Sequence, residues 1–234
     1  MQIRSKYDSE LKDVAENLLS MFMHTETAVE LCIALMKKDD NVAKEVKKEE
    51  RRIDKLELKI EKACLRLLVM QQPVASDFRI IYSTLKMVTD LERIGDQARD
   101  IAKLLAKNTC EYPKHLPEML ETVHQMFIET KTAHANRDIM LARSIDEKDD
   151  KVDSLFQEII TDIAAMVKEN PDSAEHMATF ILVAKYLERI GDHAVNLGEW
   201  VQYENTGKNP RRKKGKTSKP AIDENIHEYV SGQI

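Results

Sequence analysis

One six-residue sequence occurs twice in this chain of 234 residues. Leu-Glu-Arg-Ile-Gly-Asp stands at residues 91–96 and again at residues 187–192. An identical hexapeptide rarely arises twice by chance, so the repeat indicates a chain built from two related halves. Each copy holds a Glu and an Asp four positions apart, which places both carboxylates on one face of a helix. Any chemistry of the repeat is therefore expected at these carboxylates.

The composition is that of long amphipathic helices. One third of the residues are charged, 5% are aromatic, and Gly and Pro occur only 6 times each. Leu, Ala, Glu, Lys, Met and Ile dominate, and these residues favour helices over strands. The net charge of −5 argues against a protein that binds polyanions over its whole surface.

The chain shows no sign of export or membrane insertion. Its first 14 residues are charged and lack the apolar centre of a signal peptide. We find no uncharged apolar stretch of about 18 residues, so no transmembrane span is expected. Cys32 and Cys64 fall among apolar residues, as buried thiols do in a reducing compartment. We therefore predict a cytoplasmic protein.

Hydrophobic periodicity and breaker residues predict six long helices. Asp39–Asn41 is expected to end the first helix and to cap the second, and Asn170 with Pro171 is expected to begin the sixth. The predicted helices span residues 8–38, 42–72, 73–108, 117–137, 138–169 and 171–205.

The two halves match beyond the hexapeptide. When Asp39 is set against Asp138 without a gap, Glu50 matches Asp149 and Asp54 matches Asp153. Residues 109–117 contain two prolines and no helical period, so they form the expected boundary. We predict an all-α fold of two tandem three-helix bundles, at residues 1–110 and 116–205.

Residues 206–234 differ in kind from the rest of the chain. They are rich in basic residues mixed with Gly, Ser, Thr and Pro, and such a segment cannot bury a core. We predict a disordered tail, which could serve solubility or act as a binding arm. The lack of interleaved aromatic residues argues against nucleic-acid binding. The basic residues are Arg211, Arg212, Lys213, Lys214, Lys216 and Lys219.

Acidic side chains form stripes on four of the predicted helices. Consecutive helices joined by a short turn pack antiparallel, so each half could place two acidic stripes side by side on its outer surface. Like charges at this spacing repel, and a bound cation would remove the repulsion. Carboxylate oxygens suit hard cations such as Mg²⁺, Ca²⁺, Mn²⁺ or iron.

A plainer interpretation also remains open for these stripes. Acidic pairs are common on solvated helix faces, and Arg51, Arg93 and Arg99 are close enough in sequence to neutralise some of the charge. The glycines of the two hexapeptides are expected to allow close approach of a neighbouring helix. His193 points off its stripe and is expected to be a surface histidine.

At these residues the chain resembles the PhoU family, regulators of bacterial phosphate uptake, over residues 1–205. The family fold is two tandem three-helix bundles, and its signature is an E/D-x-x-x-D motif on the second and third helices of each half. The resemblance implies that these pairs bind iron or zinc clusters or single divalent ions, with Mg or Mn also possible. The matching residues are Glu50, Asp54, Glu92, Asp96, Asp149, Asp153, Glu188 and Asp192.

The resemblance also implies a regulatory function without catalysis. Members of the family restrain phosphate uptake and phosphate-starvation signalling when phosphate is plentiful. They work beside the phosphate ABC transporter ATPase and a membrane sensor histidine kinase. By resemblance we expect a homodimeric cytoplasmic adaptor that reaches the membrane only through these partners. The basic tail is a departure from the family pattern.

Two alternatives compete with this interpretation. The first is a ferritin-like or di-iron enzyme, which needs two Glu-x-x-His motifs pointing inward together with two further Glu. Only Glu121 with His124 fits this motif in the helices, and Glu224 with His227 lies in the tail. The second is a metal-free helical scaffold. The chain shows no Gly-rich phosphate loop and no nucleophile constellation.

Overall fold

The computed structural model describes residues 2–37, 42–70 and 73–208, and every regular element in them is helical. This confirms the predicted all-α class. The Asp39–Asn41 cluster and nearly all of the basic tail lie outside the described residues. The elements are α1 (Gln2–Met36), α2 (Ala43–Met70), α3 (Ala75–Leu105), α4 (Leu116–Asn136), α5 (Ile139–Glu169), the short 3₁₀ helix η1 (Pro171–Ser173) and α6 (Ala174–Thr206).

Side-chain caps explain two of the helix starts. The carboxylate of Asp138 accepts hydrogen bonds from Met140 N at 2.9 Å and Leu141 N at 3.0 Å, and so caps α5 at the predicted start of the helix. Asn170 caps in the same way but begins the 3₁₀ turn, with Asp172 N donating to its side chain at 3.2 Å. The predicted start of the sixth helix is therefore early by one turn, because α6 begins only at Ala174.

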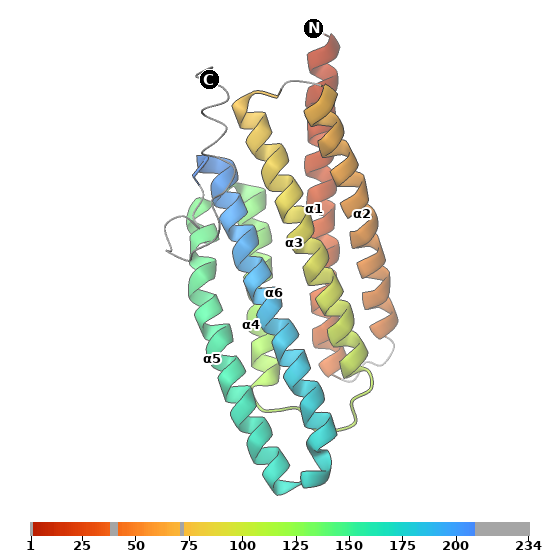
Figure 1. Cartoon of the computed structure of the whole chain (residues 1–234), viewed down its shortest axis with the longest axis vertical. Helices are drawn as coiled ribbons and strands as arrows, with labels where there is room; N and C mark the ends of the chain where they lie inside the picture. The colour runs from red at the N-terminus through yellow and green to blue at the C-terminus, as the bar shows by residue number, and fades with distance from the viewer. Residues whose placement is uncertain (1, 38–41, 71–72, 209–234) are drawn as a thin grey trace, which may run out of the picture.

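The six helices form two three-helix bundles that pack along each other (Figure 1). Within the pair, α3 lies along α6 and α1 along α4. The helices α3 and α6 run antiparallel: Asp90 pairs with His193 at 2.8 Å, and Ser83 donates to Glu204 at 3.1 Å, so one numbering rises as the other falls.

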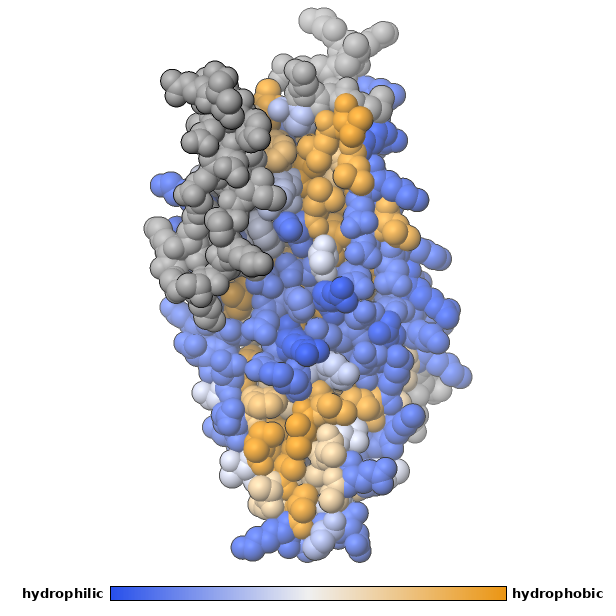
Figure 2. All heavy atoms as spheres, viewed as in Figure 1, coloured by the Kyte–Doolittle hydropathy of each residue, from blue (hydrophilic) through white to orange (hydrophobic). Residues whose placement is uncertain are grey.

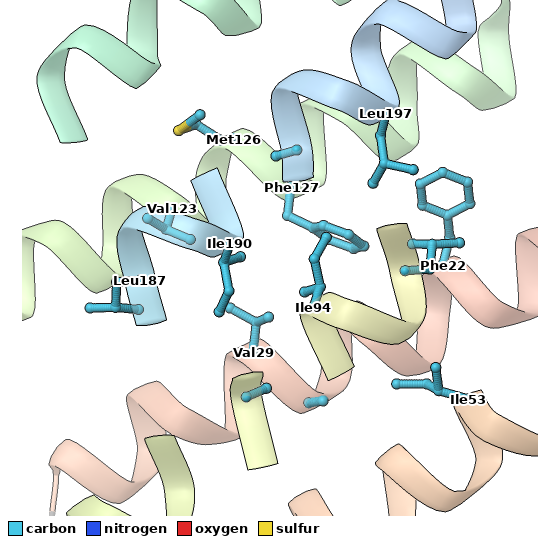
Figure 3. Packing of buried hydrophobic residues seen from close by; sticks show 14 of the residues in the cluster. Phe22, Val29, Ile53, Ile94, Val123, Met126, Phe127, Leu187, Ile190 and Leu197 are labelled. Carbon is cyan, nitrogen blue, oxygen red and sulfur yellow. The ribbon is translucent and has the colours of Figure 1, made fainter. Parts of the chain in front are cut away.

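One hydrophobic core runs through both bundles (Figure 3). Phe22 and Ile94 come from the first half, Phe127 and Ile190 come from the second, and all four are fully buried. The rings of Phe22 and Phe127 lie 5.9 Å apart between centroids. Because these residues belong to a single buried cluster, the two bundles share their interior instead of meeting at a polar interface.

The first helices of the halves carry a second repeat. Residues 21–28 read MFMHTETA and residues 126–133 read MFIETKTA, with five of eight positions identical. Phe22 therefore matches Phe127, and Glu26 matches Lys131, with which it forms an ion pair. Matched positions face each other across α1 and α4, as an approximate two-fold relation between the halves requires.

The glycines of the repeats lie where helices approach closely, as predicted. A Cβ at Gly95 would stand 2.8 Å from Ile53 Cδ1, and one at Gly191 would stand 3.2 Å from Asp149 Oδ1. The missing side chains therefore let α2 approach α3, and α5 approach α6. The approach of α5 to α6 brings the carboxylate of Asp149 against the second hexapeptide.

By length and composition alone, one helix of the described residues could cross a membrane. Lys6–Met36 contains an 18-residue window of mean hydropathy 1.3, and 44% of that window is buried inside the bundle. The window is apolar on average without being an uncharged stretch, so the sequence criterion did not select it. The apolar stripe of α1 includes the buried residues Val14, Leu18 and Phe22, so this composition is explained by a core helix.

Candidate functional site

Helices α2 and α3 bring the first two acidic pairs together. Burial raises the pKa of Asp54, and so do the charges of Glu50 and Asp96. Burial likewise raises the pKa of Glu92, with Asp96 and Asp54 adding to the effect. Carboxylates on both helices thus lie close enough to repel one another. This is the side-by-side arrangement that the spacing predicted.

Glu57 belongs to the same group, which we call the first cluster (Glu50, Asp54, Glu57, Glu92 and Asp96). Burial raises its pKa to about 7, with further contributions from Glu92, Glu61 and Asp54. The sequence places Glu57 on the acidic stripe of α2, but the family motif omits it. Its strongest charged neighbour, Glu92, lies on the other helix.

Arg99 neutralises one end of the first cluster. Its guanidinium contacts Glu50, lies 2.6 Å from Asp96, and reaches Asp100 at 3.2 Å. Glu50 is only 7% exposed, so the prediction that this pair faces outward is wrong for its first member. Burial of Glu50 requires a partner, and Arg99 supplies the positive charge. Of the three arginines suggested by the sequence, Arg99 therefore neutralises this end of the cluster, while Arg93 lies 3.4 Å from Glu92.

Helices α5 and α6 bring the second pairs together in the same way. We call Asp146, Asp149, Asp153, Glu188 and Asp192 the second cluster. Burial raises the pKa of Asp149 to about 6, with Asp192, Asp153 and Asp146 adding to it. Burial and Glu188 raise the pKa of Asp192. Lys185 forms an ion pair with Glu188 and so balances that one carboxylate.

The two clusters differ at one decisive position. In the register of the hexapeptides, Arg99 matches Val195. The second cluster therefore lacks the arginine that holds Glu50 and Asp96 in the first. Its aspartates face one another without an arginine at this position of α6, and their repulsion adds to the burial that chiefly raises the pKa of Asp149.

The second cluster opens into a cavity of about 1080 Å³, which we call the acidic cleft. Helix α3 of the first half contributes Arg93 and Gln97 to its lining, and α5 and α6 contribute the rest. Helical periodicity does not predict this cleft, because the cleft forms only where the two halves meet. Seven carboxylates line it: Asp146, Glu147, Asp149, Asp150, Asp153, Asp192 and Glu199.

His193 connects the two halves at the edge of this cleft. Its Nδ1 lies 2.8 Å from Oδ1 of Asp90 on α3, and Asn196 Nδ2 donates to the same oxygen at 3.2 Å. The side chain of His193 is 22% exposed. The expectation of a simple surface histidine is therefore wrong, since its ring holds α6 against α3.

The chemistry of the clusters suits a cation, although their side chains are not gathered around one point. Within residues 2–37, 42–70 and 73–208, no three His, Cys, Asp or Glu side chains converge closely enough to hold a metal ion. The second cluster fits a hard cation by its oxygen donors and unbalanced charge. The first cluster fits less well, because Arg99 already occupies one end. In the Glu-x-x-His motif considered for the di-iron alternative, Glu121 is exposed, while His124 lies near Glu26 and Glu30 of α1.

The raised pKa of Asp149 predicts a pH-dependent stability difference in metal-free protein. At pH 7.5 the charged carboxylate destabilises the folded state, and below about pH 4 it is protonated in both the folded and the unfolded states. Asp149→Asn is therefore expected to raise the free energy of unfolding by about 1 kcal/mol at pH 7.5, after allowance for solvent screening. The gain should shrink as the pH falls through 6.

Urea unfolding of both proteins at pH 7.5 and pH 4 in a chelator would measure this difference. Glu169→Gln, an exposed change at the end of α5, is the matched control and should show no such gain. A destabilised Asp149→Asn at pH 7.5 would contradict the proposed repulsion.

Comparisons with known proteins agree with the fold and the repeat. The PhoU domain model matches residues 18–105 and again residues 116–201. A phosphate-specific transport system accessory protein PhoU homolog of Clostridium acetobutylicum is 36% identical over 211 residues, which cover 88% of this chain and 96% of the relative. A protein of the same description from Pseudomonas aeruginosa is 34% identical and covers 86% of each chain.

Solved structures lead to the same family. The crystal structure of PhoU from Pseudomonas aeruginosa matches with a TM-score of 0.81 and 32% identity, over 86% of this chain and all of that one. The phosphate transport system regulatory protein PhoU from Streptococcus pneumoniae matches with a TM-score of 0.78 and 27% identity, over 87% of this chain and 98% of that one. With both halves matched by the domain model and the fold shared throughout, the chain belongs to the PhoU family.

Proposed function

We propose that this protein is a regulatory accessory of phosphate transport that restrains phosphate uptake and phosphate-starvation signalling. The observation that supports this most strongly is the match of both halves to the PhoU domain, with relatives described as accessory proteins of the phosphate-specific transport system. We propose further that it acts in the cytoplasm as a non-enzymatic homodimeric adaptor. Its partners would be the ATPase of the phosphate ABC transporter and a sensor histidine kinase.

The surface offers places where such partners could bind. Figure 2 shows a hydrophilic band across the middle of one face, with apolar areas toward both ends of the bundle. Val69, Val74 and Phe78 are exposed around the turn from α2 to α3, and Ile181 and Leu182 are exposed near the start of α6. Exposed apolar areas of this kind favour protein contacts.

A deletion strain tests the regulatory role. Expression of phosphate-starvation genes should rise at high phosphate when the protein is lost, and the intact chain should restore repression. Unchanged expression in the deletion strain would contradict the proposal. Affinity purification from native cells at high and low phosphate would test the two partners and would show whether their association depends on phosphate.

We propose that divalent cations bind at the second cluster and modulate this surface. Asp149, Asp153 and Asp192 would supply the oxygen ligands, and Asp146 would add to the charge. A bound cation would offset the mutual repulsion that raises the pKa of Asp149 and Asp192. The first cluster would bind more weakly, at Asp54, Glu57 and Glu92, because Arg99 balances Glu50 and Asp96.

Metal binding by carboxylate variants tests this assignment. Asp149→Asn and Asp192→Asn should each weaken binding of Mn²⁺ or Zn²⁺ by about tenfold, equivalent to about 1.4 kcal/mol. Asp54→Asn should have a smaller effect. Equilibrium dialysis with elemental analysis would measure this, with Glu169→Gln as the control. Equal metal content in all four variants would refute the proposed metal binding.

A further inference from the structure

The acidic cleft contains a buried hydrogen-bond acceptor that lacks a partner. Gln97 lines the cleft from α3 and is only 9% exposed. Its Oε1 is buried and accepts no hydrogen bond among the described residues. Leaving such an oxygen without a donor costs about 1–3 kcal/mol. The cleft therefore combines seven carboxylates with this unpartnered acceptor, and the two arginines of its lining, Arg93 and Arg189, leave the carboxylates in excess.

The size and spread of these groups also suit an extended ligand, which can contact more of the carboxylates than one ion can. The cavity holds about 1080 Å³, and within the described residues no three acidic, His or Cys side chains converge on one point. A single divalent ion needs its ligands within about 2.0–2.6 Å. Asp146, Glu147, Asp150 and Glu199 extend the negative surface beyond the proposed metal ligands. Several ammonium or guanidinium groups on one segment would satisfy these carboxylates together, and one of their N–H groups could donate to Gln97.

This chain itself carries a segment of that chemistry close by. Helix α6 ends at a left-handed Gly207 (φ 69°), whose N–H donates to Tyr203 O at 2.8 Å. A cap in this conformation ends the helix and redirects the chain. The sequence then runs Lys208-Asn-Pro-Arg-Arg-Lys-Lys-Gly-Lys-Thr-Ser-Lys219. Its dense positive charge complements the carboxylates of the cleft.

The chain is also long enough to reach the cleft. At a rise of 1.5 Å per residue, Glu199 lies about 12 Å along α6 before Gly207, and Asp192 lies about 22 Å before it. An extended chain covers about 3.3–3.6 Å per residue. The segment from Lys208 to Arg211–Lys214 therefore spans about 10–20 Å, and Lys216 and Lys219 reach about 27–38 Å.

We propose that the basic segment Arg211–Lys219 docks into the acidic cleft of its own chain. There it balances the carboxylates of α5 and α6, places a donor on Gln97 Oε1, and competes with divalent cations for the second cluster. The cleft is lined by both halves, so docking also ties α3 to α5 and α6. The tail thereby becomes an internal, salt-sensitive regulator of the surface that α3 and α6 share.

Zero-length crosslinking of the intact chain tests this contact. A carbodiimide joins carboxylates to lysines that touch them, and mass spectrometry of the monomeric fraction would identify the linked pairs. Crosslinks are expected from Lys213, Lys214 or Lys216 to Asp149, Asp150 or Glu199. Their yield should fall about tenfold when Arg211 and Arg212 are changed to Gln, which lowers the charge of the tail and keeps its lysines, and also in 1 M NaCl, where charges are screened beyond about 3 Å.

Two further variants make the test specific. Glu199→Gln with Asp150→Asn removes charge from the cleft only and should lower the yield at the remaining site, Asp149, whereas Glu169→Gln with Asp172→Asn removes the same charge outside it and should leave that yield unchanged. Gln97→Leu should lower the yield in a chain whose circular dichroism and melting temperature show that it is folded.

Four outcomes would overturn the proposal. They are crosslinks to the first cluster instead, crosslinks found only between isotope-labelled and unlabelled chains, yields that survive the change of Arg211 and Arg212 to Gln, and equal yields in the cleft and control variants. Mn²⁺ should lower the yield by competition. If the protein binds no metal, the crosslinks should still form without it, so failure of metal binding and failure of tail docking are distinguishable.

Discussion

Phe22→Ala is expected to lower the free energy of unfolding by about 3–5 kcal/mol. Phe22 is fully buried in α1, and its ring lies 5.9 Å from that of Phe127 and 5.1 Å from that of His134 on α4. Truncation would leave a cavity where the two bundles meet. Because the core is continuous, both halves should unfold in one transition at a lower urea concentration, observed by circular dichroism and by the fluorescence of Trp200 in the second half.

The double variant with Phe127→Ala measures the coupling across the two halves. The double variant should lose less unfolding free energy than the sum of the two single variants. The difference should be about 0.5–1.5 kcal/mol, as for other aromatic pairs. Phe78→Ala is the control, since that ring is 39% exposed and should cost much less. Two separate unfolding transitions, with only the first half weakened by Phe22→Ala, would contradict the shared core.

Arg99→Val is expected to make the first cluster resemble the second in its charge balance. The change leaves Glu50 buried without its cation, which should lower the free energy of unfolding by about 2 kcal/mol at pH 7.5. It should also create an additional strong cation site at Glu50, Asp54, Glu92 and Asp96. Added Mn²⁺ should then raise the melting temperature of the variant more than that of the unmodified chain, because ligand binding stabilises the folded state.

The reciprocal change provides the control. Val195→Arg places a guanidinium where the second cluster lacks one, and it should weaken cation binding there while leaving the first cluster unaffected. Arg99→Lys keeps the charge and should bind no additional metal. Equal Mn²⁺ binding by the unmodified chain, Arg99→Val and Val195→Arg would show that this matched position does not control the sites.

Most of the fold could be predicted because its signals are local. Helical periodicity is a property of each segment, and caps such as Asp138 lie within a few residues of the ends they determine. Errors arose where two local structures share a signal. Asn170 with Pro171 can begin either an α-helix or a 3₁₀ turn, and only the structure shows the turn.

The candidate site could be predicted in part. The four-residue spacing of Asp149 and Asp153 showed that these carboxylates share a helix face, and the antiparallel turn showed which faces meet. That Arg99 reaches Glu50 on α2 while Arg93 reaches only Glu92 on its own helix depends on how α3 is rotated against α2, which periodicity does not determine to within one side chain. The contrast between Arg99 and Val195 was visible in the sequence, three residues beyond each hexapeptide.

The acidic cleft could not be predicted in this way. It requires Arg93 and Gln97 of the first half to face α5 and α6 of the second. Periodicity within a helix records which face is buried, but not which distant helix covers it. The same limit hid the role of His193, whose partner Asp90 lies 103 residues away.

The ion pair between Glu26 and Lys131 indicates how the two halves of the chain diverged. These residues occupy matched positions and contact each other, as Phe22 and Phe127 do. In a symmetric pair of identical single bundles, the residue at this position would face its own copy, and two glutamates or two lysines would repel. Only after fusion could one copy become acidic and the other basic. Joining the bundles into one polypeptide thus allowed the copies to diverge, and the difference between Arg99 and Val195 is a divergence of the same kind within the clusters.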